Sequence, residues 1–201
     1  MSALTDLEQK AKECSKCTNL CKDRTNVVFG DGNDRADLMF VGEAPGRNED
    51  LQGKPFVGAA GQLLSKLLAS IGLKREDVYI ANVLKCRPPN NRDPLPDEIA
   101  VCKPLLFEQI KIIKPKIVAT LGAHATRLLL DKPISISKIH GQKFKADSYT
   151  IFPIYHPAAA LYARTTLVDL EEDFRKLKKI LNEKPDPEPE KVPQAKQQSL
   201  F

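Results

Sequence analysis

The sequence predicts an α/β fold: a single domain in which a four-stranded parallel sheet is sandwiched between helices. Short continuous apolar runs recur along the chain, and such runs are typical of parallel strands that are buried on both faces. Segments with apolar residues at helical spacing separate these runs. Because strand and helix alternate throughout, a doubly wound sheet is the expected architecture.

The first expected elements are a short N-terminal helix and a buried strand at 37–42, which reads Asp-Leu-Met-Phe-Val-Gly. A helix follows at 62–71 and ends at Gly72, a typical C-terminal stop. Its apolar face consists of Leu63, Leu64, Leu67, Leu68 and Ile71.

A second strand at 78–83 precedes a long helix from about Pro96 to Lys114. Pro104 lies inside that helix and should kink or split it, because proline removes a backbone hydrogen bond. A third strand at 116–121 leads to a short helix at 122–130.

The fourth strand is expected at 150–155, and the last helix follows it. The apolar stripe of this helix consists of Leu167, Leu170, Phe174, Leu177 and Leu181. Ligands of such folds bind at the carboxyl ends of the strands. The loops after Val41, Val83, Leu121 and Tyr155 are therefore the segments in which to look for chemistry.

Residues 1–183 form the expected domain, and 184–201 are expected to be a disordered tail in which prolines alternate with charged and polar residues. The 201 residues are 42% hydrophobic and 28% charged, as in soluble globular proteins. A net charge of +5 permits a polyanionic partner. No apolar run is long enough for a membrane span. The first residues do not resemble a secretory signal, so we expect an intracellular, cytoplasmic protein. We also expect a monomer.

Four of the five cysteines form a candidate metal site: Cys14, Cys17, Cys86 and Cys102. Four thiolates can bind one tetrahedral Zn²⁺ or one [4Fe–4S] cluster, and the spacing alone does not choose between them. Disulfides are disfavoured without a secretory signal. Ordinary buried cysteines remain an alternative, and Cys21 is left over.

Polar and aromatic residues follow the strands. Glu43 and Glu49 lie in the turn after the first strand, and Phe56 lies in a glycine-rich loop shortly after it. Asn82 ends the second strand with an amide that can both donate and accept, as the edge of a nucleobase requires. Among the histidines, His156 at the end of the fourth strand is the best site candidate, His140 is next, and His124 is expected to be structural.

Together these residues resemble the family 4 uracil-DNA glycosylases, the iron–sulfur enzymes of archaea and thermophilic bacteria. The resemblance covers roughly residues 10 to 181. The matching motifs are Gly42-Glu-Ala-Pro-Gly46, Gly53-Lys-Pro-Phe-Val-Gly58, Asn82, Lys85-Cys-Arg-Pro-Pro89 and His156-Pro157. The resemblance implies a [4Fe–4S] cluster on the four cysteines, DNA containing uracil as the partner, and hydrolysis of uracil from DNA to start base excision repair.

The resemblance also implies roles for single residues. Phe56 stacks on the flipped base, Asn82 pairs with its Watson–Crick edge, and the backbone around Ala44 contacts its carbonyl oxygens. His156 stabilises negative charge on uracil O2. Glu43 is the preferred acid to activate the water, with Glu49 as helper or alternative.

The sequence departs from related glycosylases at two points. Ala44 replaces an aspartate of the best-known glycosylase family, so another acid must activate the water. The segment from Arg87 to Pro94 lacks the histidine with which a related branch traps DNA covalently. We therefore expect turnover without a covalent adduct.

Further contacts to DNA are expected around the carboxyl ends of the strands. Leu161 or Tyr162 is a candidate wedge that enters the DNA, although both are equally compatible with a core role. Basic candidates for phosphate contacts are Lys85, Arg87, Arg92, Lys138, Lys143, Lys145 and Arg164. The end of the tail, with Gln197, Leu200 and Phe201, resembles a truncated peptide that binds the sliding clamp.

Two other functions compete with the enzyme. A non-catalytic nucleic-acid-binding module is disfavoured by the grouping of Glu43, Asn82 and His156. A nucleotide-binding α/β enzyme is suggested by the glycine-rich turn after the first strand. No Lys-Ser/Thr pair follows that turn, as a P-loop would require.

Overall fold

Four parallel strands form the centre of the computed structural model, which describes residues 2–183. They are β2 (Leu38–Gly42), β3 (Tyr79–Asn82), β4 (Ile117–Leu121) and β6 (Thr150–Ile154). Two-residue edge strands, β1 (Asp31–Gly32) and β5 (Phe144–Lys145), pair antiparallel with β3 and β6 and give the order β1-β3-β2-β4-β6-β5. The predicted parallel sheet is confirmed. The edge strands were not predicted because two residues are too few for a recognisable period.

The tail at 184–201, including its candidate clamp-binding end, lies outside the described residues. Within residues 2–183, no helix combines the length and the apolar character that crossing a membrane requires.

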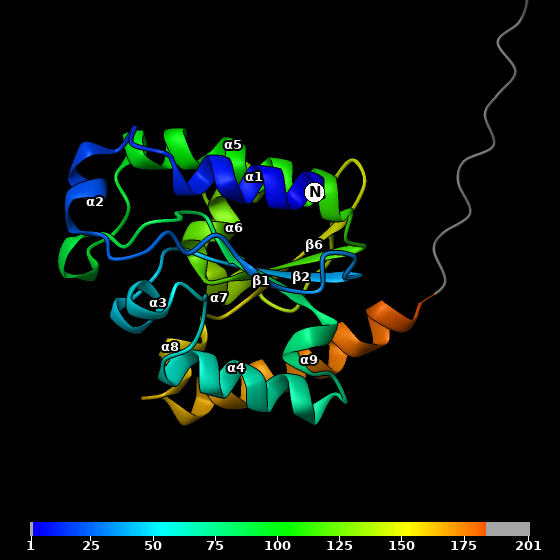
Figure 1. Ribbon diagram of the computed structural model, residues 1–201. Helices are drawn as coiled ribbons and strands as arrows, with labels where there is room; N and C mark the ends of the chain where they lie inside the picture. The colour runs from blue at the N-terminus through cyan, green and yellow to red at the C-terminus, as the bar shows by residue number, and fades with distance from the viewer. Residues whose placement is uncertain (1, 184–201) are drawn as a thin grey trace, which may run out of the picture.

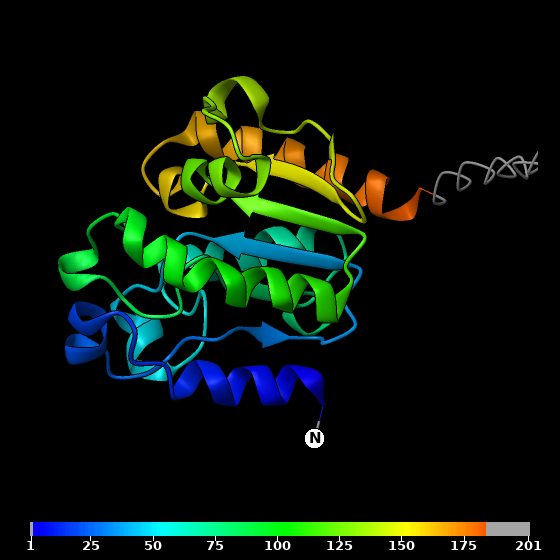
Figure 2. The same ribbon diagram turned by 90° about the horizontal axis from the view of Figure 1, so that it is seen from above.

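Helices cover both faces of the sheet (Figures 1 and 2). One face packs against α1 (Ala3–Lys12), α5 (Pro96–Ile113) and α6 (Ala123–Leu130). The other packs against α4 (Ala59–Ser70), α8 (Pro157–Ala160) and α9 (Arg164–Asn182). Shorter helices are α2 (Thr18–Asp23), α3 (Arg47–Gln52) and α7 (Ile136–Ile139), with 3₁₀ turns at Arg75–Asp77 and Pro89–Asn91.

Strand β2 shows how the apolar runs build two cores. Successive side chains of a strand point to opposite faces. Leu38 and Phe40 accordingly join the core under α4 and α9, whereas Met39 and Val41 join the core under α5 and α6. Phe40 stacks on Phe174 of α9 with ring centroids 5.8 Å apart. The predicted stripe of α9 is therefore the face that binds this helix to the sheet.

Helix α5 runs through Pro104 as one element, so the predicted split does not occur. Proline has no N–H group, so the carbonyl four residues earlier loses its hydrogen-bond partner. In α5 this is the carbonyl of Ala100. Both Pro104 and Ala100 are exposed, and water can satisfy that carbonyl on the outer face. The inner face keeps Cys102 and Leu106 buried.

Helix α3 was not predicted, because its sequence Arg-Asn-Glu-Asp-Leu-Gln lacks an apolar period. Tertiary hydrogen bonds hold it instead. The buried carboxylate of Asp50 accepts two bonds of 3.0 Å from the backbone N–H of Thr25 and a bond of 3.3 Å from that of Asn26. Glu49 of this helix is thereby fixed beside the end of β2.

The stack of Phe40 on Phe174 predicts a stability effect. We expect Phe174→Ala to lower the free energy of unfolding by about 3–5 kcal/mol, because it empties a fully buried ring site. Val168 lies on the same helix and is 55% exposed, so the control Val168→Ala should change stability by at most about 0.5 kcal/mol. Urea unfolding of both variants measures the difference, and equal effects would contradict this view of the core.

Candidate functional site

A cavity of about 380 Å³ lies at the carboxyl ends of the parallel strands. It combines loops that follow β2, β3 and β6, as the topology predicts. Predicted site residues that line it are Glu43, Ala44, Glu49, Phe56, Asn82, Arg92 and His156. The structure thus brings together every residue that was predicted to catalyse the reaction or to bind the substrate.

Asn82 is the most informative residue of this cavity. Its side chain is 1% exposed, and its Oδ1 has no hydrogen-bond partner among the described residues. A buried acceptor without a partner costs about 1–3 kcal/mol, so such atoms are rare in folded proteins. The register pairs Gly42 with Asn82, and a Cβ at position 42 would lie 2.4 Å from Asn82 Oδ1. Glycine therefore gives the amide its space, and a bound molecule with an N–H group would satisfy it.

Phe56 is held in a strained conformation beside this amide. Its φ of 53° lies in the left-handed region that non-glycine residues rarely adopt. Arg75 stabilises the loop by donating to the carbonyls of Phe56 and Pro55 over 3.0 and 2.8 Å. A Cβ at Gly61 would lie only 1.8 Å from the carbonyl oxygen of Phe56, so only glycine fits at the third position of helix α4. The result is an aromatic ring fixed at the cavity.

Glu49 supports this loop through its carboxylate. Its Oε1 accepts bonds of 2.9 Å from the backbone N–H groups of both Val57 and Gly58. These groups stand at the N-terminus of α4, where anions are favoured. One oxygen of Glu49 is therefore committed to structure.

His156 presents a neutral imidazole to the cavity. Burial lowers its pKa to about 4, although the nearby Glu49 acts in the opposite direction. Its Nδ1 accepts a bond of 3.1 Å from the backbone N–H of Ala158, so the neutral ring carries its proton on Nε2. The ring also lies 5.6 Å from that of Phe56.

Glu43 is the carboxylate whose side-chain oxygens make no hydrogen bond within the described residues. Burial raises its pKa, a protonated His124 lowers it, and Asp93 raises it again. Glu43 Oε2 and His124 Nε2 are 3.8 Å apart. His124 was expected to be structural, and the structure places it beside the main candidate acid. The helix that carries His124 begins at the end of β4, and only the fold shows that this end adjoins Glu43.

The cysteines also come together. Burial raises the pKa of the Cys17 thiol to about 11, and the neighbouring thiols of Cys102, Cys14, Cys86 and Cys21 add to the effect. These five groups belong to the N-terminal segment, to the loop after β3 and to α5. Neighbouring thiols that resist ionisation are suited to a cationic metal centre, which stabilises thiolates.

Arg24 lies beside this group and was not singled out from the sequence. Its Nη1 is 3.3 Å from Cys86 Sγ and 3.4 Å from Cys21 Sγ. Cys21, which has no counterpart in the family pattern, thus lies next to the other four. A cationic donor of this kind orients and stabilises metal-binding thiolates.

Lys85 is not a phosphate contact, contrary to the prediction. It is 1% exposed and donates to the carbonyl of Asn82 over 2.8 Å and to Gln109 Oε1 over 2.6 Å. Gln109 in turn donates to the carbonyl of Phe29 and to Tyr79 Oη. The lysine therefore fixes the end of β3 from inside the protein.

The other DNA candidates differ in position. Tyr162 and Leu161 are 93% and 41% exposed between α8 and α9, so the alternative of a core role is excluded. Arg164 is exposed at the start of α9. Arg87 donates to Asn91, while Arg92 forms a bidentate pair with Glu98 over 2.6 and 2.9 Å.

Two groups lie away from the cavity. His140 bonds the buried Asp173 over 2.7 Å, which gives it a structural role and reverses its predicted rank. Lys143 pairs with Glu183 at the end of α9, about 28 Å along this helix from Arg164.

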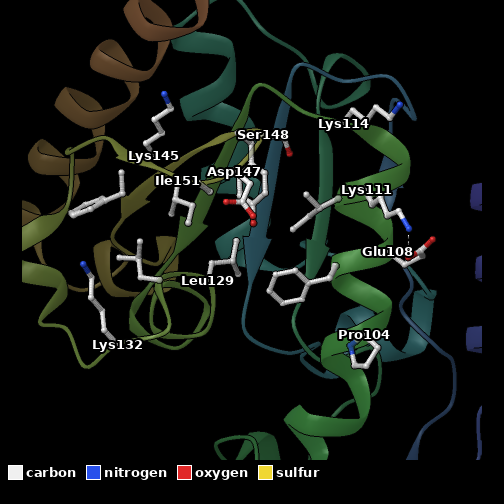
Figure 3. A pocket seen from close by; sticks show the side chains of 16 residues that line it. Pro104, Glu108, Lys111, Lys114, Leu129, Lys132, Lys145, Asp147, Ser148 and Ile151 are labelled. Carbon is white, nitrogen blue, oxygen red and sulfur yellow. Dashed lines mark ion pairs between the residues drawn. The ribbon is translucent and has the colours of Figure 1, made fainter. Parts of the chain in front are cut away.

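A larger hollow of about 950 Å³ lies between α5, α6 and the β5–β6 hairpin (Figure 3). Lysines and apolar side chains line it, among them Lys111, Lys132, Lys145 and Ile151. It contains none of the residues that were predicted to catalyse or to bind substrate within the described chain. The candidate site is therefore the smaller cavity at the strand ends.

Comparison with known proteins gives a consistent assignment. The family model of the uracil DNA glycosylase superfamily matches residues 29–183. The chain is 50% identical to the type-4 uracil-DNA glycosylase of Saccharolobus solfataricus, over 92% of this chain and 89% of the relative. It is 45% identical to that of Archaeoglobus fulgidus, over 92% and 96% of the two chains. It is 44% identical to that of Thermotoga maritima, over 87% and 93%.

The orphan amide predicts an unusual stability pattern. We expect Asn82→Ala to leave the free energy of unfolding unchanged or to raise it by up to about 1 kcal/mol, because the buried acceptor has no partner to lose. The control Gln109→Ala removes an equally buried amide that is fully bonded. It should cost about 2–4 kcal/mol. A large loss of stability in Asn82→Ala during urea unfolding would show that the amide is satisfied internally.

Proposed function

This chain belongs to the uracil-DNA glycosylase superfamily and to its type-4 family, and we propose that its strand-end cavity holds a uracil flipped out of DNA. The chain is thus a glycosidic hydrolase that removes uracil from DNA, the first step of base excision repair. A base in a duplex must leave the stack before its glycosidic bond can be attacked. The observation that carries the proposal is the orphan Oδ1 of Asn82 inside the cavity.

Asn82 supplies the recognition of the base. Uracil presents an N–H donor at N3 beside a carbonyl acceptor at O4, and a carboxamide offers the complementary acceptor and donor. Cytosine has an acceptor at N3 and a donor at position 4, so the same orientation of the amide leaves both groups mismatched. Lys85 fixes the backbone of Asn82. The amide is therefore held in place before the base arrives.

Phe56 supplies a flat apolar surface for the flipped ring. Stacking of a base on an aromatic side chain contributes about 1–3 kcal/mol. The strained backbone of Phe56 is held by Arg75 and by Glu49 through the next two residues. The backbone around Glu43 and Ala44 lines the same cavity and is positioned to contact the carbonyl oxygens of the base.

His156 acts on the leaving group as a neutral donor. The C1′–N1 bond breaks with its electron pair going to the base, so negative charge grows on uracil O2. An imidazole with its proton on Nε2 can donate a hydrogen bond to that oxygen, and its lowered pKa keeps it neutral above about pH 4. No proton needs to be lost before the ring can act.

Glu43 acts on the other side of the breaking bond. A water molecule adds its oxygen to C1′ and gives a proton to the carboxylate, while the leaving uracil takes up a proton in its turn. The same negative charge offsets the cationic sugar of the transition state. Glu43 suits this role better than Glu49, because one oxygen of Glu49 already binds two backbone N–H groups.

Cys14, Cys17, Cys86 and Cys102 are the residues that we assign to a [4Fe–4S] cluster. Their crowding, the donation from Arg24 and the family of the chain support this assignment. When bound, the cluster supplies a cross-link among three distant segments. The reacting carbon and the two carboxylates of the cavity need no electron from it, so its role is structural.

The DNA surface surrounds the cavity. Tyr162 and Leu161 are the candidate wedges, because large apolar side chains at a loop tip can fill the space that a flipped base leaves. Arg87, Arg92 and Arg164 are the candidate phosphate contacts. Arg92 would approach DNA while paired with Glu98, so we expect it to contribute less than Arg164.

The remaining expectations concern the binding partners of the protein and its location in the cell. We propose that the enzyme acts as a monomer on chromosomal DNA inside the cell. Gln197, Leu200 and Phe201 would bind a sliding clamp, although these residues lie outside the described part of the chain.

The choice of acid can be tested with isosteric variants. A uracil-containing oligonucleotide is treated with protein and then with alkali, and cleavage is followed at single turnover. We expect Glu43→Gln to lower the rate by about 10²–10⁴-fold. Glu49→Gln keeps an oxygen for the two backbone donors and should lower it by about tenfold or less.

Two results would contradict these assignments. Absence of cleavage by the wild-type protein with its metal centre intact would reject the proposed function. Loss of rate in Glu49→Gln alone would show that Glu43 is the wrong acid.

The metal assignment has its own test. We expect protein purified without oxygen to contain about four irons, to contain no stoichiometric zinc and to absorb near 400 nm. Cys86→Ser should lose this absorption and unfold at lower temperature. Cys21→Ser should keep both properties, because Cys21 is the spare thiol. Equal iron loss in the two variants would overturn the choice of ligands.

A further inference from the structure

His124 is a polar neighbour of Glu43 to which no role has been assigned. It lies in the first turn of α6, and its Nε2 is 3.8 Å from Glu43 Oε2 and 3.8 Å from Asp93 Oδ2. Asp93 belongs to the loop before α5. Three segments that are distant in sequence thus bring two carboxylates to the same imidazole nitrogen, with one ligand atom of each residue within 4.8 Å of the other two.

We propose that His124 is a positioning residue that keeps Glu43 anionic and directed at the cavity, with Asp93 supporting the imidazole from the solvent side. This inference rests on the proposed function, in which the carboxylate of Glu43 takes a proton from water. It goes beyond that function because it adds a group that never touches the substrate.

The environment of Glu43 explains why such a group is needed. The side chain is 29% exposed, and burial raises the pKa of its carboxyl group. A neutral carboxylic acid can neither accept a proton from water nor offset a sugar cation. Protonated His124 opposes the effect of burial and lowers the pKa of Glu43, while Asp93 raises it.

Other charged groups around the cavity do not replace His124. Glu49, Arg92 and His156 line the same cavity. Glu49 is an acid, and His156 has a pKa lowered to about 4 by burial. Arg92 directs its guanidinium to Glu98. Within the described residues, His124 is therefore the basic side chain that lies beside Glu43.

The fold of α6 does not depend on His124. Thr126 anchors this helix through its hydroxyl, which bonds Thr120 Oγ1 over 2.8 Å and the carbonyl of Gly122 over 2.7 Å. Ala125 fills the core beneath it. His124 is 35% exposed on the opposite side. Its replacement should therefore leave the structure intact and change only the charge beside Glu43.

The test is the pH dependence of single-turnover uracil excision, measured between pH 5 and 9 at saturating protein. If protonation of Glu43 stops the reaction, then removing the cation moves the acidic limb to higher pH. For His124→Gln we expect the midpoint of the acidic limb to move up by about 0.5 pH unit. At pH values below this midpoint, that shift corresponds to about a threefold loss of rate. The rates should converge at high pH, where Glu43 is ionised in both proteins.

Two matched variants define the result. His124→Lys retains a cation and should restore the acidic limb of the wild type. Arg127→Gln removes a positive charge from an exposed position on the same helix, and it should leave the limb in place. Affinity for DNA and the thermal midpoint should be unchanged in all three variants.

The proposal is overturned if His124→Gln has the wild-type pH profile, or if it loses rate equally at every pH together with stability. An infrared titration separates this failure from that of the proposed function. The carboxyl band of Glu43, identified by its absence in Glu43→Gln, should titrate at higher pH in His124→Gln. If the wild type does not excise uracil, the proposed function fails, while the titration still decides whether His124 controls Glu43.

Discussion

The register between β2 and β3 places Gly42 beside Asn82, and the candidate site depends on this pairing. Because position 42 has no side chain, the amide of Asn82 and the ring of Phe56 can approach the same point. A Cβ at position 42 would lie 2.6 Å from Phe56 Cζ. The strands themselves are buried on both faces, so their register cannot slip without moving both cores. A packing constraint of the sheet thus sets the geometry of the candidate site.

A buried polar chain connects that point with the rest of the molecule. Lys85 binds the backbone of Asn82 and the side chain of Gln109, and Gln109 binds Phe29 and Tyr79. Desolvation lowers the pKa of Lys85 to about 7, which is the expected consequence of placing an amine among neutral acceptors. Such a network is rigid because each buried donor would lose its partner if one member moved. Cys86 follows Lys85 directly, so the cysteine group and the amide of Asn82 are connected by a short stretch of backbone that Lys85 holds.

The site carries several features that oppose stability. Phe56 has a strained backbone, Asn82 an unsatisfied acceptor and Glu43 a partly buried carboxyl group. Each has neighbours that hold it or lie against it: Arg75 and Glu49 for the loop, Lys85 for the strand end and His124 for the acid. Unfavourable conformations that surrounding contacts hold in place are typical of functional sites. This division explains why the cavity is preformed, and why residues outside it matter for its chemistry.

The sequence by itself determined the parallel strands, the main helices and the residues at the cavity, because apolar periodicity and ordered motifs are local signals that survive without a structure. It did not reveal α3, which is held by hydrogen bonds to a distant segment, or the edge strands, which are only two residues long. It also misjudged Lys85, and it did not reveal the neighbours of His124 and His140. The motif Lys85-Cys86-Arg87 looks basic and exposed, yet the fold turns Lys85 inward and leaves Arg87 partly exposed. Whether a histidine faces a buried aspartate or a catalytic acid depends on which strand ends are neighbours, and only the tertiary structure decides that.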